Sequence, residues 1–340
     1  MSKQIIQGFP PMQKEEFKVY VRSLTFNQSA YIEDCLNGVS MQQTDFPYVH
    51  HVVDDCSTDG EQGVIKAWME KNCDMENAEY YNNDFCTITL VRNNKNPNCT
   101  LAAYFLKKNM YGNPKKTELF SPWREACPYE AICEGDDLWI SEKKLQRQYD
   151  TLEAHREVDI CSCGAIREKD GVQVGIIQPS EEERILQLEE IITGGGGYIA
   201  TNTLVLRTNL FNDNFKFWQY FSLDYFWQIR GSLRGGMYFI PDCMSIYRVC
   251  ALESWTERVK QKPIELLEWK LRSLETLGIL NMETGQRYNN VIMKKKKNDI
   301  FLFFQVALQT DVYDTTFRNL PVKRKLETLR ILIKKFFFNG

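Results

Sequence analysis

Two clusters of carboxylates are the residues of this chain best suited to chemistry. One is Asp54-Asp55 and the other is Glu134-Gly135-Asp136-Asp137, and each directly follows a short apolar run. Carboxylates packed this closely repel one another unless a cation or a ligand rich in hydrogen-bond donors lies among them. Oxygen ligands of this kind favour Mg²⁺ or Mn²⁺ over zinc. The plainer alternative is that such acids cap helices by accepting hydrogen bonds from free N–H groups.

The elements around both clusters alternate between strands and helices. We expect strands over residues 19–25, 48–53, 87–91, 130–133 and 158–163. Apolar residues at helical spacing predict helices over residues 29–42, 63–68, 100–109 and 142–155. This alternation is typical of βαβ units around a parallel sheet. In such sheets ligands bind outside the carboxyl ends of strands, which is where both acidic clusters fall.

Composition excludes several classes of protein. With 43% hydrophobic and 26% charged residues, the 340-residue chain is neither disordered nor of low complexity. A net charge of −3 argues against a general nucleic-acid binder. The eleven cysteines show no repeated metal-ligand or disulfide spacing. Because residues 1–11 lack the apolar stretch of a secretory signal, we expect a cytoplasmic protein in a reducing compartment.

Four segments between residues 17 and 256 carry a resemblance to a known family. They are VYVRSLTFNQSAYIEDCLNGVSMQQ, HHVVDDCSTDG, AICEGDDLWISEKKLQRQ and LDYFWQIRGSLRGGMYFIPDCMSIYRV. In this order they resemble the first strand, the acidic turn, the metal segment and the acceptor-side helix of bacterial family-2 glycosyltransferases. Those are inverting enzymes with the GT-A fold. The resemblance implies an α/β fold with a mostly parallel central sheet, a GT-A domain over residues 1–256 and a helical region over residues 257–340.

The resemblance also implies a set of contacts to the nucleotide-sugar. These come from Thr25, Asn27, Asp54, Asp55, Arg92, Asp137 and Arg248. Either Asp54 or Asp55 would accept a hydrogen bond from a uracil-type base or a ribose hydroxyl. For Arg92 an ordinary surface position is the alternative. Departures from the family include Cys56, which replaces a Gly in the turn, and Cys250, which stands where many relatives carry His.

A metal site and a catalytic base follow from the same resemblance. Asp136 matches the metal ligand, and Glu134 occupies the first acidic place of that motif, where Asp is commoner. Asp224 matches the base, since an acceptor hydroxyl becomes nucleophilic only if a carboxylate within about 3 Å takes its proton. The alternative for Asp224 is an ordinary acid in the first turn of a helix over residues 222–232.

The expected activity is therefore that of a glycosyltransferase of the hexosyltransferase type. It would use Mg²⁺ or Mn²⁺ and move a sugar from a nucleotide-diphospho-sugar, with UDP favoured, to a glycan or lipid-linked acceptor in cell-surface polysaccharide synthesis. One alternative is a sugar nucleotidyltransferase, but a Gly-rich phosphate loop does not follow the first predicted strand. The other is a non-catalytic glycan- or partner-binding protein, which need not retain both Asp136 and Asp224.

The last fifty residues differ in charge from the rest of the chain. Residues 291–340 contain 11 Lys or Arg against four Asp or Glu, so they carry +7 and the first 290 residues carry −10. Within them, residues 323–338 place apolar side chains at helical spacing among basic ones. Such a helix suits peripheral contact with the anionic inner face of a membrane. The alternative is a helix that packs on the protein's own core.

Overall fold

The computed structural model describes residues 4–12, 16–212, 215–221, 223–249, 251 and 263–309. The chain forms two compact units. The first comprises Met1–Asp213 and Asp224–Arg258, and the second comprises Asn214–Leu223 and Val259–Gly340. Residues 323–338 and Cys250 lie outside the described residues, so the predictions made for them stay predictions.

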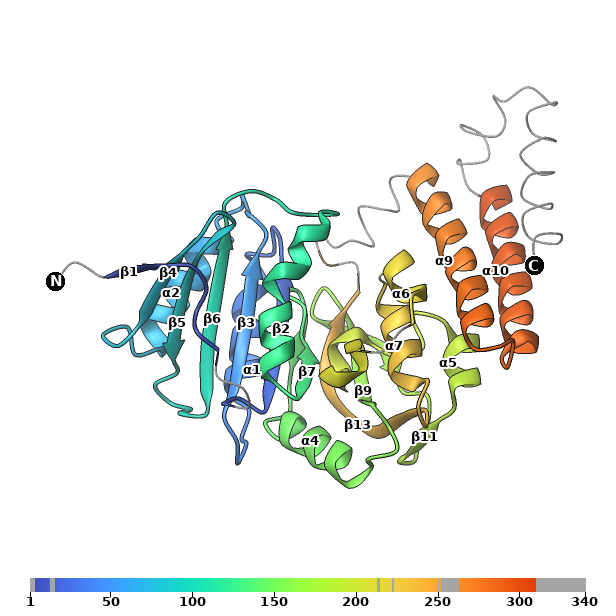
Figure 1. The fold of residues 1–340 in the computed structure, drawn as a ribbon, viewed down its shortest axis with the longest axis horizontal. Helices are drawn as coiled ribbons and strands as arrows, with labels where there is room; N and C mark the ends of the chain where they lie inside the picture. Colours follow the sequence, from blue (N-terminus) through green and yellow to red (C-terminus); the bar gives the residue numbers. More distant parts are fainter. Residues whose placement is uncertain are drawn as a thin grey trace. The chain divides into compact units, whose positions relative to one another are not determined.

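One large sheet forms the centre of the first unit (Figure 1). Its strands are β1 (Ile5–Gln7), β2 (Val19–Thr25), β3 (Tyr48–Asp54), β4 (Glu79–Asn82), β5 (Cys86–Arg92), β6 (Cys99–Leu106), β7 (Tyr129–Ile132), β8 (Leu138–Trp139), β9 (Ile160–Lys169), β10 (Val172–Ile177), β11 (Arg184–Leu186), β12 (Val205–Arg207) and β13 (Met237–Arg248). They pair in the order β1-β4-β5-β6-β3-β2-β7-β12-β9-β13-β11, with β10 on β9 and β8 on β13.

The centre of this sheet is parallel, as predicted. Strands β6, β3, β2 and β7 all run in the same direction. Antiparallel strands extend the sheet on both sides, through β4 and β5 beyond β6 and through β12 beyond β7. The predicted α/β class, with a mostly parallel centre, is therefore confirmed.

Helices cover both faces of the sheet in the first unit. They are α1 (Ile32–Ser40), α2 (Glu61–Asn72), α3 (Ser121–Ala126), α4 (Lys144–Ala154), α5 (Leu188–Gly194) and α7 (Asp224–Ser232), with short 3₁₀ turns η1 (Pro114–Leu119), η2 (Thr201–Thr203) and η3 (Thr208–Asn212). Alternate residues of β2 enter different cores. Val19 and Val21 pack with Leu36 of α1, whereas Tyr20 packs with Trp123 of α3.

The helix predicted over residues 100–109 is wrong, because this segment is strand β6. Its residues Leu101–Leu106 are all buried between β3 and β5. A strand buried on both faces has an almost continuous apolar sequence with no alternation, so periodicity does not separate it from a buried helix. Ala102 and Ala103 have high helix propensity, so residue preference does not separate the two structures either.

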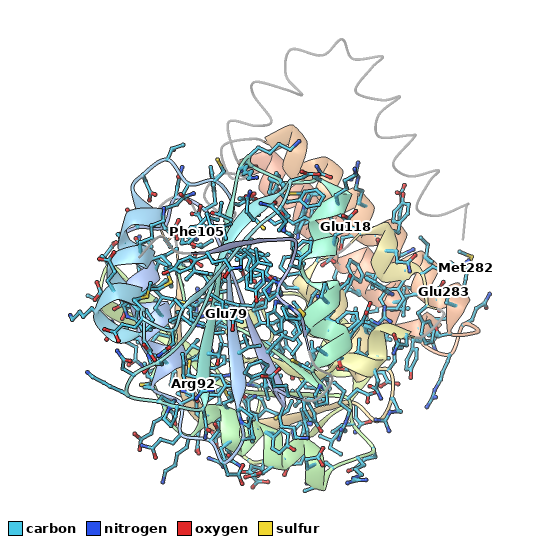
Figure 2. The ribbon with its side chains drawn as sticks, turned by 60° about the vertical axis from the view of Figure 1, so that its left-hand side comes forward. Glu79, Arg92, Phe105, Glu118, Met282 and Glu283 are labelled. Atoms are coloured by element: carbon cyan, nitrogen blue, oxygen red, sulfur yellow. The ribbon has the colours of Figure 1, made fainter. Side chains whose placement is uncertain are left out.

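The described part of the second unit is helical. It consists of α6 (Phe217–Tyr220), α9 (Pro263–Glu283) and α10 (Asn289–Gln309), and α9 and α10 lie side by side (Figure 1). Glu283, labelled in Figure 2, accepts hydrogen bonds from the backbone N–H groups of Lys216 and Phe217 at the start of α6. None of the described helices combines the length and the apolar character needed to cross a membrane.

Candidate functional site

The two acidic clusters meet at one edge of the sheet. Thr25, the last residue of β2, pairs in register with Asp54, which ends β3 and pairs in turn with Phe105 of β6. The acidic segment after β7 continues along the same edge, since the N–H of Gly135 donates to the carbonyl of Leu24 at 3.0 Å. The carboxyl ends of three parallel strands thus bring together residues more than 100 positions apart in the sequence.

Gly135 allows the acidic segment to cross directly above β2. A Cβ at this position would lie 2.2 Å from Oγ1 of Thr25 and 2.4 Å from Oε1 of Gln28. Both distances are far below van der Waals contact, so a side chain at residue 135 would push the segment away. This close approach sets the position of the acidic side chains relative to Thr25.

A buried glutamate that sequence reasoning missed supports the turns at this edge. Glu61, at the start of α2, has no exposed surface and accepts hydrogen bonds from Thr25 Oγ1, from the N–H of Gln28 at 3.0 Å and from Ser57 Oγ at 2.7 Å. Burial raises the pKa of Glu61. The Thr25 hydroxyl, predicted to line the nucleotide pocket, is therefore engaged in holding α2 against β2.

The turn after β3 adopts the conformation expected of the Gly that Cys56 replaces. Cys56 has a φ of 64° and Asn27 a φ of 55°, both in the left-handed region that disfavours side chains. Asn27 compensates by bonding across the two turns. Its backbone N–H donates to Ser57 Oγ at 2.9 Å, and its Oδ1 accepts from the N–H of Thr58 at 2.8 Å.

The neighbouring Asp54 and Asp55 have different surroundings. Asp55 accepts from the N–H of Met110 at 2.6 Å and from Lys116 Nζ at 2.7 Å, so both of its oxygens are engaged. Asp54 accepts from Gln62 Nε2 at 2.6 Å through Oδ1, while its buried Oδ2 has no hydrogen-bond partner among the described residues. A buried carboxylate oxygen without a partner is costly. Asp54 is thus the member of the pair that has an unsatisfied acceptor oxygen.

The acidic segment crowds several carboxyl groups in a partly dehydrated place. Burial raises the pKa of Glu134 to about 7, with Arg22 opposing the rise and Asp224 and Asp136 adding to it. Burial also raises the pKa of Asp136, and that of Asp137 is raised by burial together with its acidic neighbours. This arrangement favours the approach of a positive charge.

Arg248 lies against the acidic segment, as expected, but it already has protein partners. Its Nη1 donates to the carbonyl of Asp136 at 3.3 Å, and its Nη2 contacts Asp34 Oδ2 at 2.5 Å. Its guanidinium also lies 5.0 Å from the ring centroid of Tyr31. The neighbouring Tyr247 was not predicted. Burial raises its pKa to about 12, and the nearby carboxylates of the acidic segment and Asp224 add to the rise.

Asp224 belongs to the same site. It is the first residue of α7, and its Oδ2 accepts a hydrogen bond from Thr201 Oγ1 at 3.0 Å. Its charge adds to the raised pKa values of both Glu134 and Tyr247, so Asp224 lies within electrostatic range of the acidic segment. Thr201 begins η2, whose next residue, Asn202, accepts from the indole of Trp139 at 2.8 Å. Two segments distant in the sequence thus position Asp224.

Arg92 is the predicted site residue that the structure does not bring to this edge. It ends β5 and pairs with Thr100, at the start of β6, whereas Phe105 near the end of β6 pairs with Asp54. Figure 2 shows Arg92 and Phe105 at opposite ends of the sheet. The prediction for Arg92 is corrected, because an antiparallel strand carries its carboxyl end to the other edge. Arg92 there lines a hollow with Asp74 and Glu79.

The residues present are compatible with a magnesium or manganese ion that is completed by substrate. Within the described parts of the chain, no three His, Cys, Asp or Glu side chains converge into a ready-made metal site. Mg²⁺ is usually held by one or two carboxylates, with water and substrate phosphates as its other ligands. Glu134 and Asp136 would supply such a pair, and burial, the main cause of their raised pKa values, gives their charged forms a need for a compensating cation.

Comparison with known proteins finds remote relatives. No known family model matches the chain. It is 26% identical to the uncharacterized proteins Mb1547 of Mycobacterium bovis and Rv1520 of Mycobacterium tuberculosis over 234 residues, 68% of this chain. The match spans 59% of the length of these curated relatives.

Two solved structures are similar in fold at low identity. TarS of S. aureus (residues 1–349) in complex with UDP is 20% identical with a TM-score of 0.45, over 82% of this chain and 75% of that one. A mannosyltransferase from Pyrobaculum calidifontis in complex with GDP-Man and Mn²⁺ is 13% identical with a TM-score of 0.46, over 93% of this chain and 80% of that one. Likenesses at TM-scores below 0.5 do not establish a shared activity.

Proposed function

We propose that the protein is an inverting, metal-dependent glycosyltransferase of the GT-A type, with its catalytic domain in residues 1–256. One observation supports this proposal most. The acidic segment after β7 lies beside the carboxyl ends of β2 and β3, and burial raises the pKa of Glu134 to about 7, with a contribution from the charge of Asp224. A dense set of carboxyl groups at this edge suits a cation and a polar ligand.

The nucleotide of the donor would bind at the ends of β2 and β3. Asp54 has an engaged Oδ1 and a free, buried Oδ2 among the described contacts. A uracil-type base has an N–H group that can donate a hydrogen bond to this oxygen. Thr25, Asn27 and Asp55 shape the same edge through their hydrogen bonds to neighbouring turns. We therefore favour a UDP-sugar as donor.

Glu134 and Asp136 would hold Mg²⁺ or Mn²⁺, with Asp137 next to the donor sugar. When bound, the ion neutralises the charge that grows on the departing diphosphate. Arg248 contributes by fixing the carbonyl of Asp136 through a 3.3 Å hydrogen bond. It thereby holds the backbone of the metal segment in place.

Asp224 would act as the base. Thr201 donates to its Oδ2 at 3.0 Å, which orients the carboxylate and leaves the other oxygen to accept a proton. An acceptor hydroxyl within about 3 Å of that oxygen loses its proton as it attacks the anomeric carbon. Attack from the side opposite the diphosphate inverts the configuration of the sugar.

The acceptor in this proposal is a hydroxyl of a glycan or of a lipid-linked precursor of a cell-surface polysaccharide. The basic residues 323–338 would bring the enzyme to the cytoplasmic face of the membrane. This part of the proposal rests on the sequence pattern. Finding the protein wholly in the soluble fraction at low salt would contradict it.

The test is a panel of nucleotide-sugars assayed for metal-dependent nucleotide release, with calorimetry in parallel. We expect one UDP-sugar to bind in the presence of Mn²⁺, to bind at least tenfold more weakly in EDTA, and to be hydrolysed slowly without acceptor. Binding without turnover under any condition would support a non-catalytic glycan- or partner-binding protein instead. Absence of binding across the panel would overturn the proposal.

A further inference from the structure

Arg22 is an arginine in the middle of the central strand β2, where parallel sheets are normally apolar. Its side chain is 7% exposed. An arginine keeps its charge at all relevant pH values, so burying it is costly unless carboxylates surround it. Its partners therefore indicate why the charge is there.

The first partner of Arg22 is a fully buried glutamate. Arg22 Nε donates to Glu130 Oε1 at 2.9 Å, and Arg124 Nε donates to Glu130 Oε2 at 2.8 Å. Although burial raises the pKa of Glu130, Arg124 and Arg22 hold it below its usual value. Glu130 is thus ionised, and one carboxylate faces two guanidinium groups. A positive charge remains to be balanced by another acid.

The second partner of Arg22 is Glu134, in the acidic segment of the candidate site. Arg22 Nη1 lies 3.6 Å from Glu134 Oε1. The same guanidinium lies 4.9 Å from the ring centroid of Trp227. Trp227 follows Asp224 by three residues on α7, so the two side chains lie on the same side of that helix. One guanidinium therefore contacts both the metal segment and the helix of the base.

We propose that Arg22 is a positioning residue that fixes Glu134 relative to α7 and so sets the separation between the metal segment and Asp224. This inference rests on the proposed function. A planar guanidinium can bond to two carboxylates in its plane while an aromatic ring covers its face. A lysine supplies the charge but not this geometry. The buried pair of Glu130 and Arg124 anchors the arrangement to the sheet.

The test compares Arg22→Lys with Arg207→Lys. Arg207 is also a poorly exposed arginine, at 15%, but it bonds to Tyr129 away from the acidic segment. We expect Arg22→Lys to weaken Mn²⁺ binding and to lower kcat by about 10- to 100-fold each, as outer-shell partners of metal ligands do, with a donor KM close to wild type. Arg207→Lys should leave both quantities within about threefold of wild type.

A second variant separates the two contacts of Arg22. Trp227→Leu removes the ring that covers the guanidinium but leaves the approach to Glu134. We expect it to lower kcat and to leave Mn²⁺ affinity unchanged. If Arg22→Lys does not fold, Arg22→Met removes one of the two guanidinium groups, leaves Glu130 paired with Arg124, and should show the same loss of Mn²⁺ affinity. Wild-type Mn²⁺ affinity and kcat in whichever of these Arg22 variants folds would overturn the proposal.

Hydrogen exchange distinguishes failure of this inference from failure of the proposed function. In Arg22→Lys, backbone exchange should rise several-fold in residues 134–137 and 224–230 and stay unchanged in β3. If wild-type protein releases no nucleotide from any sugar donor but this exchange pattern appears, the transferase proposal fails and the positioning role stands. If exchange in both segments equals wild type, the positioning role is wrong whatever the activity.

Discussion

The hydroxyl of Thr201 donates a 3.0 Å hydrogen bond to Oδ2 of Asp224, and the two residues come from segments 23 positions apart. Thr201 belongs to η2, which is tied by Asn202 to the carbonyl of Ile246 in β13 at 2.7 Å. The carboxylate at the start of α7 is therefore oriented by the sheet and not only by its own helix. This relationship supports the proposed role of Asp224 as a base over that of an ordinary acid at a helix N-terminus.

Replacing Asp224 with Asn should spare donor binding and reduce sugar transfer. The amide still accepts the hydrogen bond from Thr201 but cannot take a proton, so we expect kcat to fall by about 10²- to 10⁴-fold. Calorimetry with the donor and Mn²⁺ measures binding, and product formation measures transfer. Asp242→Asn, at an exposed carboxylate, is the matched control. Transfer at the wild-type rate by Asp224→Asn would show that the base is assigned wrongly.

Replacing Asp136 with Ala should abolish metal-dependent donor binding. This substitution removes one of the two carboxylates proposed to hold the ion, and Glu134 alone is a weak site. We expect the calorimetric difference between Mn²⁺ and EDTA to disappear. Asp84→Ala, at an exposed acid outside the site, should keep that difference. An Asp136→Ala protein that still binds donor more tightly with Mn²⁺ would exclude Asp136 as a ligand.

Adding a methyl group at Gly135 should disturb the site directly. The new Cβ would lie 2.2 Å from Thr25 Oγ1, so the acidic segment must move away from β2. We expect a loss of about 1–3 kcal/mol in the free energy of unfolding and a loss of donor binding. Gly63→Ala in α2 is the control, since its Cβ meets nothing within 4 Å.

Gly63→Ala should stabilise the protein by about 0.5–1 kcal/mol, because alanine has the higher helix propensity. Urea unfolding measures the change in the free energy of unfolding in both Gly135→Ala and Gly63→Ala. Equal stability and donor affinity in the Gly135→Ala and wild-type proteins would contradict the close crossing of the acidic segment above β2.

His51 should make the stability of the protein depend on pH. It is fully buried on β3, and burial together with Arg22, His50 and Arg124 holds its pKa well below the ordinary value of 6.5. Below pH 6.5 the unfolded chain therefore binds a proton that the folded chain excludes. This contribution to stability is fully present above pH 6.5 and is lost as the pH falls further.

His51→Phe tests this dependence. Neither ring nitrogen of His51 has a hydrogen-bond partner among the described residues, and the rings of Tyr104, Phe120 and Trp123 surround it. We expect the fall in Tm between pH 7.5 and pH 5 to shrink by a few degrees in His51→Phe. His155→Gln, at a half-exposed histidine, should keep the wild-type dependence. If Tm falls as much in His51→Phe as in the wild-type protein between pH 7.5 and pH 5, buried His51 does not cause the pH dependence.

Strands with a simple local pattern and the parallel centre of the sheet were predictable, but the antiparallel direction of β5 was not. Residues 19–25 and 48–53 are apolar runs ended by polar turns, and they form β2 and β3. The run over residues 100–109 contains the same kind of residues but lies between two strands, so its local sequence resembles a buried helix. Arg92 was misplaced for a related reason, because nothing in residues 86–92 indicates that β5 runs antiparallel to β6.

The sequence by itself determined the α/β class and the two acidic clusters, because apolar periodicity and the ends of apolar runs are local properties. The tertiary structure decided which polar groups meet there. Glu61 reaches Thr25 across 36 positions, and Arg22 reaches Glu130 across 108. Such pairings depend on strand order, strand direction and the close crossing at Gly135. The residue type determines the charge of a side chain, but the folded structure determines which other side chain that charge contacts.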